Sequence, residues 1–288
     1  MQDFIAQFNR IDLSAPWLIP FGDIHHAFDK DKDKLQGGLA PWLNAYFAKE
    51  NIVPRHHDNG TPLTFTAQDD LPHGTAYERH IYQSHKIPTR DNLHDWFGAC
   101  IWSAFPKTKA LLNAKHHAHM SADNHRNRLR DTITVFDENG AILLVSDETI
   151  GYDIADALAQ FDWQNCLINS RQYWHDPTSP KDSDKAQILL FGHALLEQLI
   201  TPRKPLCSHT VILNVPPTFF GLPLDKKLAF VDGFLCWRLD KLLQDGVTPR
   251  TLNPLPILGV PYFWDNDDPA FYDDEFVFRS GRKDKTNS

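Results

Sequence analysis

The residue types best suited to chemistry lie together in the segment Arg90-Asp91-Asn92-Leu93-His94-Asp95. If this segment begins a helix, Asp91 and Asp95 lie one turn apart on the same face. Asn92 and His94 would lie beside them. Carboxylate and imidazole groups at this spacing can bind a divalent metal ion, and His94 can transfer protons. The segment therefore indicates Asp91, His94 and Asp95 as catalytic residues or metal ligands.

A purely structural interpretation of the same segment stays open. A helix that begins here needs a capping side chain, and Arg90 can pair with a neighbouring acid without any further role. A second acid–base candidate is His193, which follows Gly192 within an apolar stretch. A lone histidine there is either a satisfied core residue or faces a pocket, where the glycine lets another group approach.

The stretch from Lys107 to Arg130 is basic, with three lysines and three arginines against one aspartate, in a chain of net charge −8. Lys109, Asn113 and Arg130 could therefore hold a small anionic ligand such as one that bears a phosphate group, with Arg90 and Asn92 as further contacts. The alternative is a binding module that uses this stretch on nucleic acid or on an acidic protein partner. A solvated helix face accounts for the charges equally well.

The apolar pattern predicts the elements that must position these residues. Leu93, Phe97, Ile101 and Phe105 recur every four residues, which indicates a helix with one buried face. We expect Thr89 to cap this helix, and Pro106 to separate it from a second helix over 107–119. Further predicted helices cover 149–160, 186–200 and 224–242. Strands are predicted over 63–66, 78–83 and 211–215.

Two β-prone runs flank Asn139-Gly140, and this pattern predicts a hairpin near 132–146. Helices outnumber strands, and the strands cluster instead of alternating with helices. The sequence therefore predicts an α+β fold, helix-rich, with a small antiparallel sheet that includes this hairpin. We expect a single domain over 1–288 with a disordered tail at 280–288.

The remaining composition indicates a soluble protein of the cytoplasm. No apolar run approaches the length of a membrane span, and the N-terminus lacks the pattern of a secretory signal. The four cysteines are widely spaced, as is typical of reduced thiols. Neither a nucleophile elbow nor a phosphate-binding glycine loop occurs in the sequence.

Several motifs resemble a bacterial family of unknown function, domain of unknown function 3025. They are Ile87-Pro-Thr-Arg-Asp-Asn-Leu-His-Asp95, Trp102, Phe105-Pro106, Lys109, Leu112-Asn113, Arg130-Asp131, Asp137-Glu-Asn-Gly-Ala141, Gly192-His193, Leu255-Pro-Ile-Leu-Gly-Val-Pro261 and Asp268-Pro-Ala-Phe-Tyr-Asp-Asp274. The family pattern has Asn where this chain has Gly98. The resemblance covers most of the chain and implies no activity, so whether the protein is an enzyme stays open.

Overall fold

The computed structural model describes residues 2–120 and 128–281, and within them ten α-helices accompany six strands. The helices are α1 (Gln2–Phe8), α2 (Gly22–Asp31), α3 (Leu39–Lys49), α4 (Tyr77–Ser84), α5 (Leu93–Ala104), α6 (Pro106–Ala118), α7 (Arg128–Asn139), α8 (Thr149–Ala159), α9 (His193–Gln198) and α10 (Leu224–Leu242). The strands are β1 (Thr64–Ala67), β2 (Lys86–Thr89), β3 (Gly140–Ser146), β4 (Ala186–Leu190), β5 (Cys207–Val215) and β6 (Asn253–Pro256). The predicted helix-rich α+β class is confirmed. The predicted tail lies almost wholly outside the described residues.

The main sheet has four strands in the order β4-β3-β5-β6. β3 pairs with β4 in antiparallel and with β5 in parallel orientation, and β6 is antiparallel to β5. Every residue of β3 and β4 is buried, which explains their mostly apolar sequences. β1 and β2 form a separate parallel pair. The main sheet is thus mixed, and the prediction of an antiparallel sheet is wrong in this respect.

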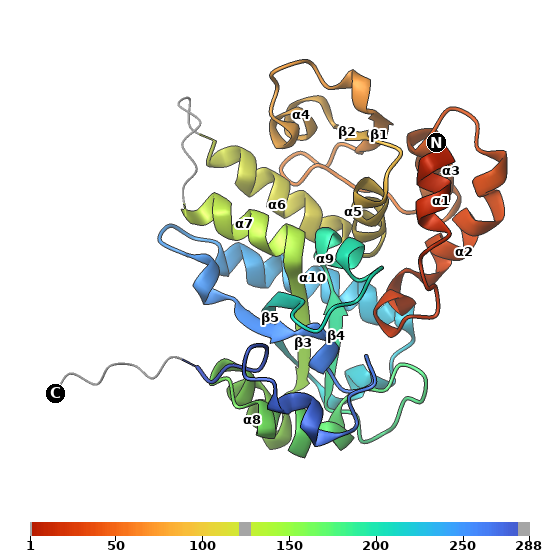
Figure 1. Cartoon of the computed structure of the whole chain (residues 1–288). Coiled ribbons are helices and arrows are strands. Elements are labelled where there is room, and N and C mark those ends of the chain that lie inside the picture. The colour runs from red at the N-terminus through yellow and green to blue at the C-terminus, as the bar shows by residue number, and fades with distance from the viewer. Residues whose placement is uncertain (1, 121–127, 282–288) are drawn as a thin grey trace.

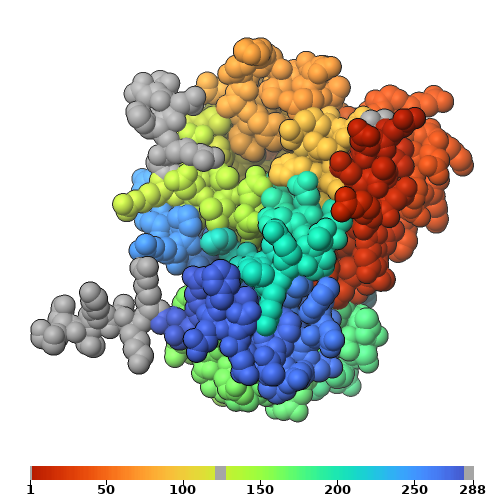
Figure 2. Space-filling view, in the orientation of Figure 1, coloured from red at the N-terminus to blue at the C-terminus, as the bar shows by residue number. Residues whose placement is uncertain are grey.

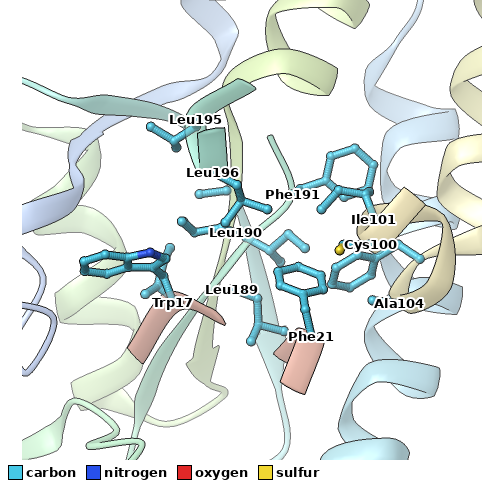
Figure 3. Close-up of a cluster of buried hydrophobic side chains, with 14 of the residues drawn as sticks. Trp17, Phe21, Cys100, Ile101, Ala104, Leu189, Leu190, Phe191, Leu195 and Leu196 are labelled. Carbon is cyan, nitrogen blue, oxygen red and sulfur yellow. The ribbon is translucent and has the colours of Figure 1, made fainter. Parts of the chain in front are cut away.

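The predicted apolar stripe of the central helix is confirmed. Phe97, Ile101 and Phe105 have no exposed surface, and α5 ends just before Pro106, as expected. The buried face of α5 meets the end of β4 and the start of α9, where Phe191 and Leu196 lie in the same cluster (Figure 3). This face holds α5 against the sheet by apolar burial.

The predicted hairpin over 132–146 is wrong. Its first arm belongs to α7, and along this helix Leu129, Ile133 and Phe136 are buried at helical spacing. α7 runs directly into β3, whose first residue is Gly140. A Cβ at Gly140 would lie 2.3 Å from the carbonyl oxygen of Phe136. Glycine is needed here for a close approach between backbone segments and not for a turn.

Three other local predictions are also wrong. Residues 78–83 form part of α4 instead of a strand, because α4 packs along α6 and buries His80 and Ile81. Residues 186–200 do not form one helix, because the apolar run at its start is the buried strand β4. Thr89 ends β2, and Asn92 caps α5 in its place.

The helices lie around the main sheet. In Figure 1, α6 and α7 lie side by side above it, and α8 lies at the lower end of β3. Figure 2 shows the N-terminal helices gathered on one side of the molecule and the C-terminal chain spread over the lower part. None of the described helices has the length and apolar character that crossing a membrane requires.

Candidate functional site

Separate parts of the chain meet at the edge of the sheet where β3 begins and β4 ends. Because these strands are antiparallel, Ala141 pairs with Leu190. The residues just before β3 therefore lie beside those just after β4. These are the last turn of α7 and the start of α9. α5 packs against α9 and forms a third side of the same region (Figure 1).

Gly192 allows the start of α9 to lie directly on the junction between α7 and β3. A Cβ on Gly192 would lie 2.5 Å from the Cα of Asn139 and 2.5 Å from the carbonyl oxygen of Glu138. A side chain of any size would separate the two segments. Glycine thus places His193, the first residue of α9, beside the last turn of α7.

His193 is held in one tautomer by its surroundings. Its Nδ1 lies 2.8 Å from the backbone carbonyl oxygen of Asp137, which can only accept, so Nδ1 carries the hydrogen. Burial lowers the pKa of His193 to about 4, against the opposing effect of the Asp137 carboxylate. The neutral ring therefore presents the lone pair of Nε2.

His94 reaches the same point from the first turn of α5. Its Nδ1 lies 3.1 Å from Oε2 of Glu197, a carboxylate oxygen that accepts the hydrogen bond. Its Nε2 lies 3.1 Å from Nε2 of His193, and the two rings are 4.5 Å apart at an angle of 72°. The two imidazoles thus point the same kind of atom at each other.

This contact between two Nε2 atoms has a chemical consequence. With both Nδ1 atoms donating elsewhere, two lone pairs face each other at 3.1 Å. They repel unless a proton or a cation lies between them. Buried polar groups in folded proteins are normally matched donor to acceptor, so the contact is not what folding alone would select.

A carboxylate lies next to this pair. Oε2 of Glu138, from the last turn of α7, is 3.7 Å from Nε2 of His193. Burial raises the pKa of Glu138, and the neighbouring Asp137 carboxylate raises it further. His, Cys, Asp and Glu side chains can bind a metal ion. In the part of the chain that the structure describes, His94, Glu138 and His193 are the one group of three or more of them whose ligand atoms all lie within 4.8 Å of one another.

Lys109 fixes the end of α7 against α6. Its Nζ lies 2.7 Å from Oδ1 of Asp137, and both side chains are largely buried. Burial alone would raise the pKa of Asp137, but the charge and hydrogen bond of Lys109, together with the nearby histidines, lower this pKa overall. Lys109 also lies over the ring of Trp102 at 5.6 Å. The ion pair keeps the turn that carries Glu138 in place.

The group borders a polar cavity of about 150 Å³, whose wall includes His94, His193 and Glu138. A second cavity of about 250 Å³ adjoins it and extends along α6 and α7. Six residues line both cavities, namely Tyr77, Glu78, Trp102, Lys109, Asp137 and Glu138. The two cavities together offer room for a small polar molecule.

The structural interpretation holds for part of the predicted segment. Oδ1 of Asn92 accepts from the backbone N–H of Asp95 at 2.8 Å and caps α5. The Asp95 carboxylate accepts from the backbone N–H of Arg90 at 2.6 Å and from its Nη2 at 2.8 Å. Arg90 and Asp95 also line the smaller cavity, so the capped helix start forms one of its walls.

Asp91 lies apart from this group. Because α5 begins at Leu93, the prediction that Asp91 and Asp95 share a helical face is wrong. Oδ1 of Asp91 accepts from the backbone N–H of Leu39 at 2.8 Å, at the start of α3. Of the three predicted metal ligands, His94 alone belongs to the group at the cavity.

The predicted substrate-binding residues of the basic stretch line the larger cavity. They are Lys109, Asn113 and Arg130. Asn113 Nδ2 donates to Oε2 of Glu78 at 2.6 Å, and burial raises the pKa of that glutamate.

The basic stretch does not present all its charges to a partner. Lys109 pairs with Asp137, and Lys115 pairs with Asp240 at 2.9 Å. Arg126 lies outside the described residues. The binding-module alternative thus gains no support from Lys109 or Lys115.

Sequence reasoning missed three acids, namely Asp137, Glu138 and Glu197. The first two were interpreted as residues of a hairpin turn. Glu197 carries a weak signal, because it follows His193 at a spacing of four and shares its helical face. Glu197 contacts His94, and Asp137 and Glu138 contact His193, through tertiary structure that has no local sequence pattern.

Comparison with known proteins gives one match. The family described as Protein of unknown function (DUF3025) matches residues 63–282, a range that includes all the site residues above. No curated protein matches the chain. No solved structure matches it either.

Proposed function

The chain belongs to the DUF3025 family, whose description assigns no activity, and from the site itself we propose that the protein is an enzyme. It acts on a small anionic substrate, by acid–base or metal-assisted chemistry, at the cavity lined by His94, His193 and Glu138. One observation carries the proposal, namely the 3.1 Å contact between the Nε2 atoms of the two histidines.

This contact supports a function because two hydrogen-bond acceptors face each other and neither can donate to the other. Most polar atoms in a protein core are matched, as both nitrogens of His25 are by the carbonyl oxygen of Phe21 and the indole N–H of Trp96. At the cavity, the paired Nε2 atoms need a proton or a cation. A proton held there can be transferred to or from a substrate in the adjoining space, and a cation held there can polarise the substrate.

Cationic side chains on the cavity wall can contact an anionic substrate. Lys109 lines both parts of the cavity, Arg90 the smaller part and Arg130 the larger part. Half of the Arg90 side chain is exposed, so its guanidinium can contact a ligand while it remains bonded to Asp95. Glu138, with its raised pKa and partial exposure, is placed to exchange a proton with a bound group.

The experiment is a turnover screen on the purified full-length chain. The panel contains phosphate monoesters, phosphodiesters, and carboxylate-bearing esters and amides, each assayed with and without added Zn²⁺. We expect turnover of at least one class, reduced at least about 100-fold in His193→Asn, the range of losses when an acid–base or electrophilic group is removed. Asn keeps a donor near the Nδ1 position and removes Nε2.

His25→Asn is the matched control. His25 also donates Nδ1 to a backbone carbonyl and is buried, but it lies among Phe8 and Trp96, away from the cavity. It should keep turnover per folded molecule. No turnover on the whole panel, or equal turnover in His193→Asn and wild type, would count against an enzyme.

We also propose the cytoplasm as the location. All four cysteines are free thiols, and Cys100 and Cys166 are buried. Free thiols are typical of a reducing compartment. Labelling of the native protein in cells with a thiol reagent checks this, because oxidised Cys207, which is exposed, would not react.

A further inference from the structure

We infer that His94, His193 and Glu138 bind one divalent transition-metal ion, with Zn²⁺ as the ion that fits best. The inference rests on the proposed function, because it names the cation that the facing Nε2 atoms need. It chooses the metal-assisted route over an acid–base route at the same cavity.

The distances suit a shared ion. Two nitrogens 3.1 Å apart, each at the Zn–N bond length of about 2.1 Å, subtend about 95° at the ion. The 3.7 Å between Nε2 of His193 and Oε2 of Glu138 corresponds to about 125° with bonds of the same length. Both angles are compatible with a distorted tetrahedron. Glu138 is partly exposed, so a small rotation can complete the set.

The hydrogen bonds behind the ligands are those of a metal site. A metal-bound histidine usually donates its second N–H to a carboxylate or a backbone carbonyl, which fixes the ring and its tautomer. His94 donates to the carboxylate of Glu197, and His193 donates to the carbonyl of Asp137. Each histidine thus has one of the two usual partners, and both rings turn Nε2 toward the same point.

The charge balance favours a dication over a single proton. The nearby cations already face acids, because Lys109 pairs with Asp137 and Arg90 pairs with Asp95. The carboxylates of Glu138 and Glu197 stand beside the two imidazoles. One divalent ion would match these two negative charges, whereas one proton shared by the rings would match only one of them.

The ligand types set the class of the ion and its role. Imidazole nitrogen with a carboxylate suits Zn²⁺ and other first-row transition ions, whereas Mg²⁺ and Ca²⁺ prefer oxygen alone. Three protein ligands leave a coordination position for water or substrate, which is the arrangement of catalytic zinc sites. The cavity of about 150 Å³ lies at this position, so a substrate group could reach the ion.

The test is a calorimetric titration of chelator-treated, full-length protein with Zn²⁺ alone. We expect one ion per chain in the wild type. His94→Asn, His193→Asn and Glu138→Gln should each weaken binding by about 100-fold or more, because a direct ligand is lost. Glu197→Gln should weaken it by about 10-fold, the scale for a group that orients a ligand. Mg²⁺ at millimolar concentration should not compete.

Asp91→Asn is the matched control, because Asp91 is an acid near His94 in sequence that binds the backbone of Leu39 instead. It should bind Zn²⁺ as the wild type does. Equal affinity in wild type and both histidine variants would overturn the inference, as would failure of the wild type to bind. If a histidine variant does not fold, Glu138→Gln decides, since its partly exposed side chain is the least needed for packing.

The titration and the turnover screen can fail separately. If Zn²⁺ binding depends on the three ligands but no substrate class is turned over, the metal site is supported as a structural site and the proposed enzyme activity is contradicted. Turnover that is lost in His193→Asn, in a wild type that binds no Zn²⁺, would leave the acid–base enzyme and remove the metal.

Discussion

Gly192 donates its backbone N–H to the carbonyl oxygen of Gly140 at 2.8 Å, and this contact joins the end of β4 to the start of β3. Both glycines are needed for close approach. Gly140 passes the carbonyl of Phe136, and Gly192 lies on the backbone of Asn139. The contact sets the distance between His193 and the acids of α7. The site therefore depends on two positions that carry no functional group.

Gly192→Ala should disrupt the site without touching a functional side chain. Its Cβ would lie 2.5 Å from backbone atoms that cannot rotate away, so α9 must move. We expect a loss of about 1–3 kcal/mol in the free energy of unfolding, as for other overpacked positions, together with weaker Zn²⁺ binding. Thermal denaturation and titration measure the two effects. Gly221→Ala is the control, because a Cβ there meets nothing within 4 Å and Gly221 lines neither cavity. A wild-type affinity for Gly192→Ala would contradict the account.

Lys109→Met should destabilise the fold more than a surface lysine substitution does. It leaves Asp137 largely buried without its cation, a change that costs about 3–5 kcal/mol in comparable buried pairs. Chemical denaturation checks this. In the double variant with Asp137→Asn, much of the loss should be recovered, because the uncompensated charge is gone. Strictly additive losses would mean that the pair is not coupled.

Asp91→Ala should lower stability and leave the site intact. Asp91 accepts from the backbone N–H of Leu39, so its removal costs about 1 kcal/mol, as for other helix-start acceptors. Turnover and Zn²⁺ affinity should not change. A large loss of either in folded Asp91→Ala would return Asp91 to the functional group and speak against the position of the site.

His25 should make the protein acid-sensitive. Burial lowers its pKa to about 4 from an ordinary value of 6.5. Between these pH values the unfolded chain binds more protons than the folded chain, so stability falls as the pH falls from 6.5 to 4. The contribution is about 3 kcal/mol over this window. Denaturation at a series of pH values gives the free energy of unfolding as a function of pH. Between pH 4 and 6.5 its slope should be shallower for His25→Gln than for the wild type, and His26→Gln, at an exposed position, should retain the wild-type slope.

Local patterns in the sequence predicted much of the fold. The stripe from Leu93 to Phe105 was predicted correctly, because burial of one helical face leaves a period that a single segment displays. The helices over 149–159 and 224–242 were predicted for the same reason. By contrast, Asn139-Gly140 has the composition of a turn, while the reason for Gly140 is the nearby carbonyl of Phe136. A single sequence does not separate these two reasons.

The sequence predicted only part of the site, for a related reason. His94 and His193 were both predicted as acid–base candidates, yet nothing local pairs residues that stand 99 positions apart. Their meeting depends on the antiparallel pairing of β3 with β4, and β4 had been predicted as a helix. Glu138 was missed because it was assigned to a turn. Its role follows only once α7 is known to end beside α9.

Anomalous diffraction at the zinc absorption edge, from crystals of the full-length protein grown with Zn²⁺, tests the central claim most directly. We predict a peak about 2.1 Å from Nε2 of both His94 and His193, with an oxygen of Glu138 as a third ligand. Zinc peaks at other histidines only, with the two Nε2 atoms still facing each other and no peak between them, would contradict it.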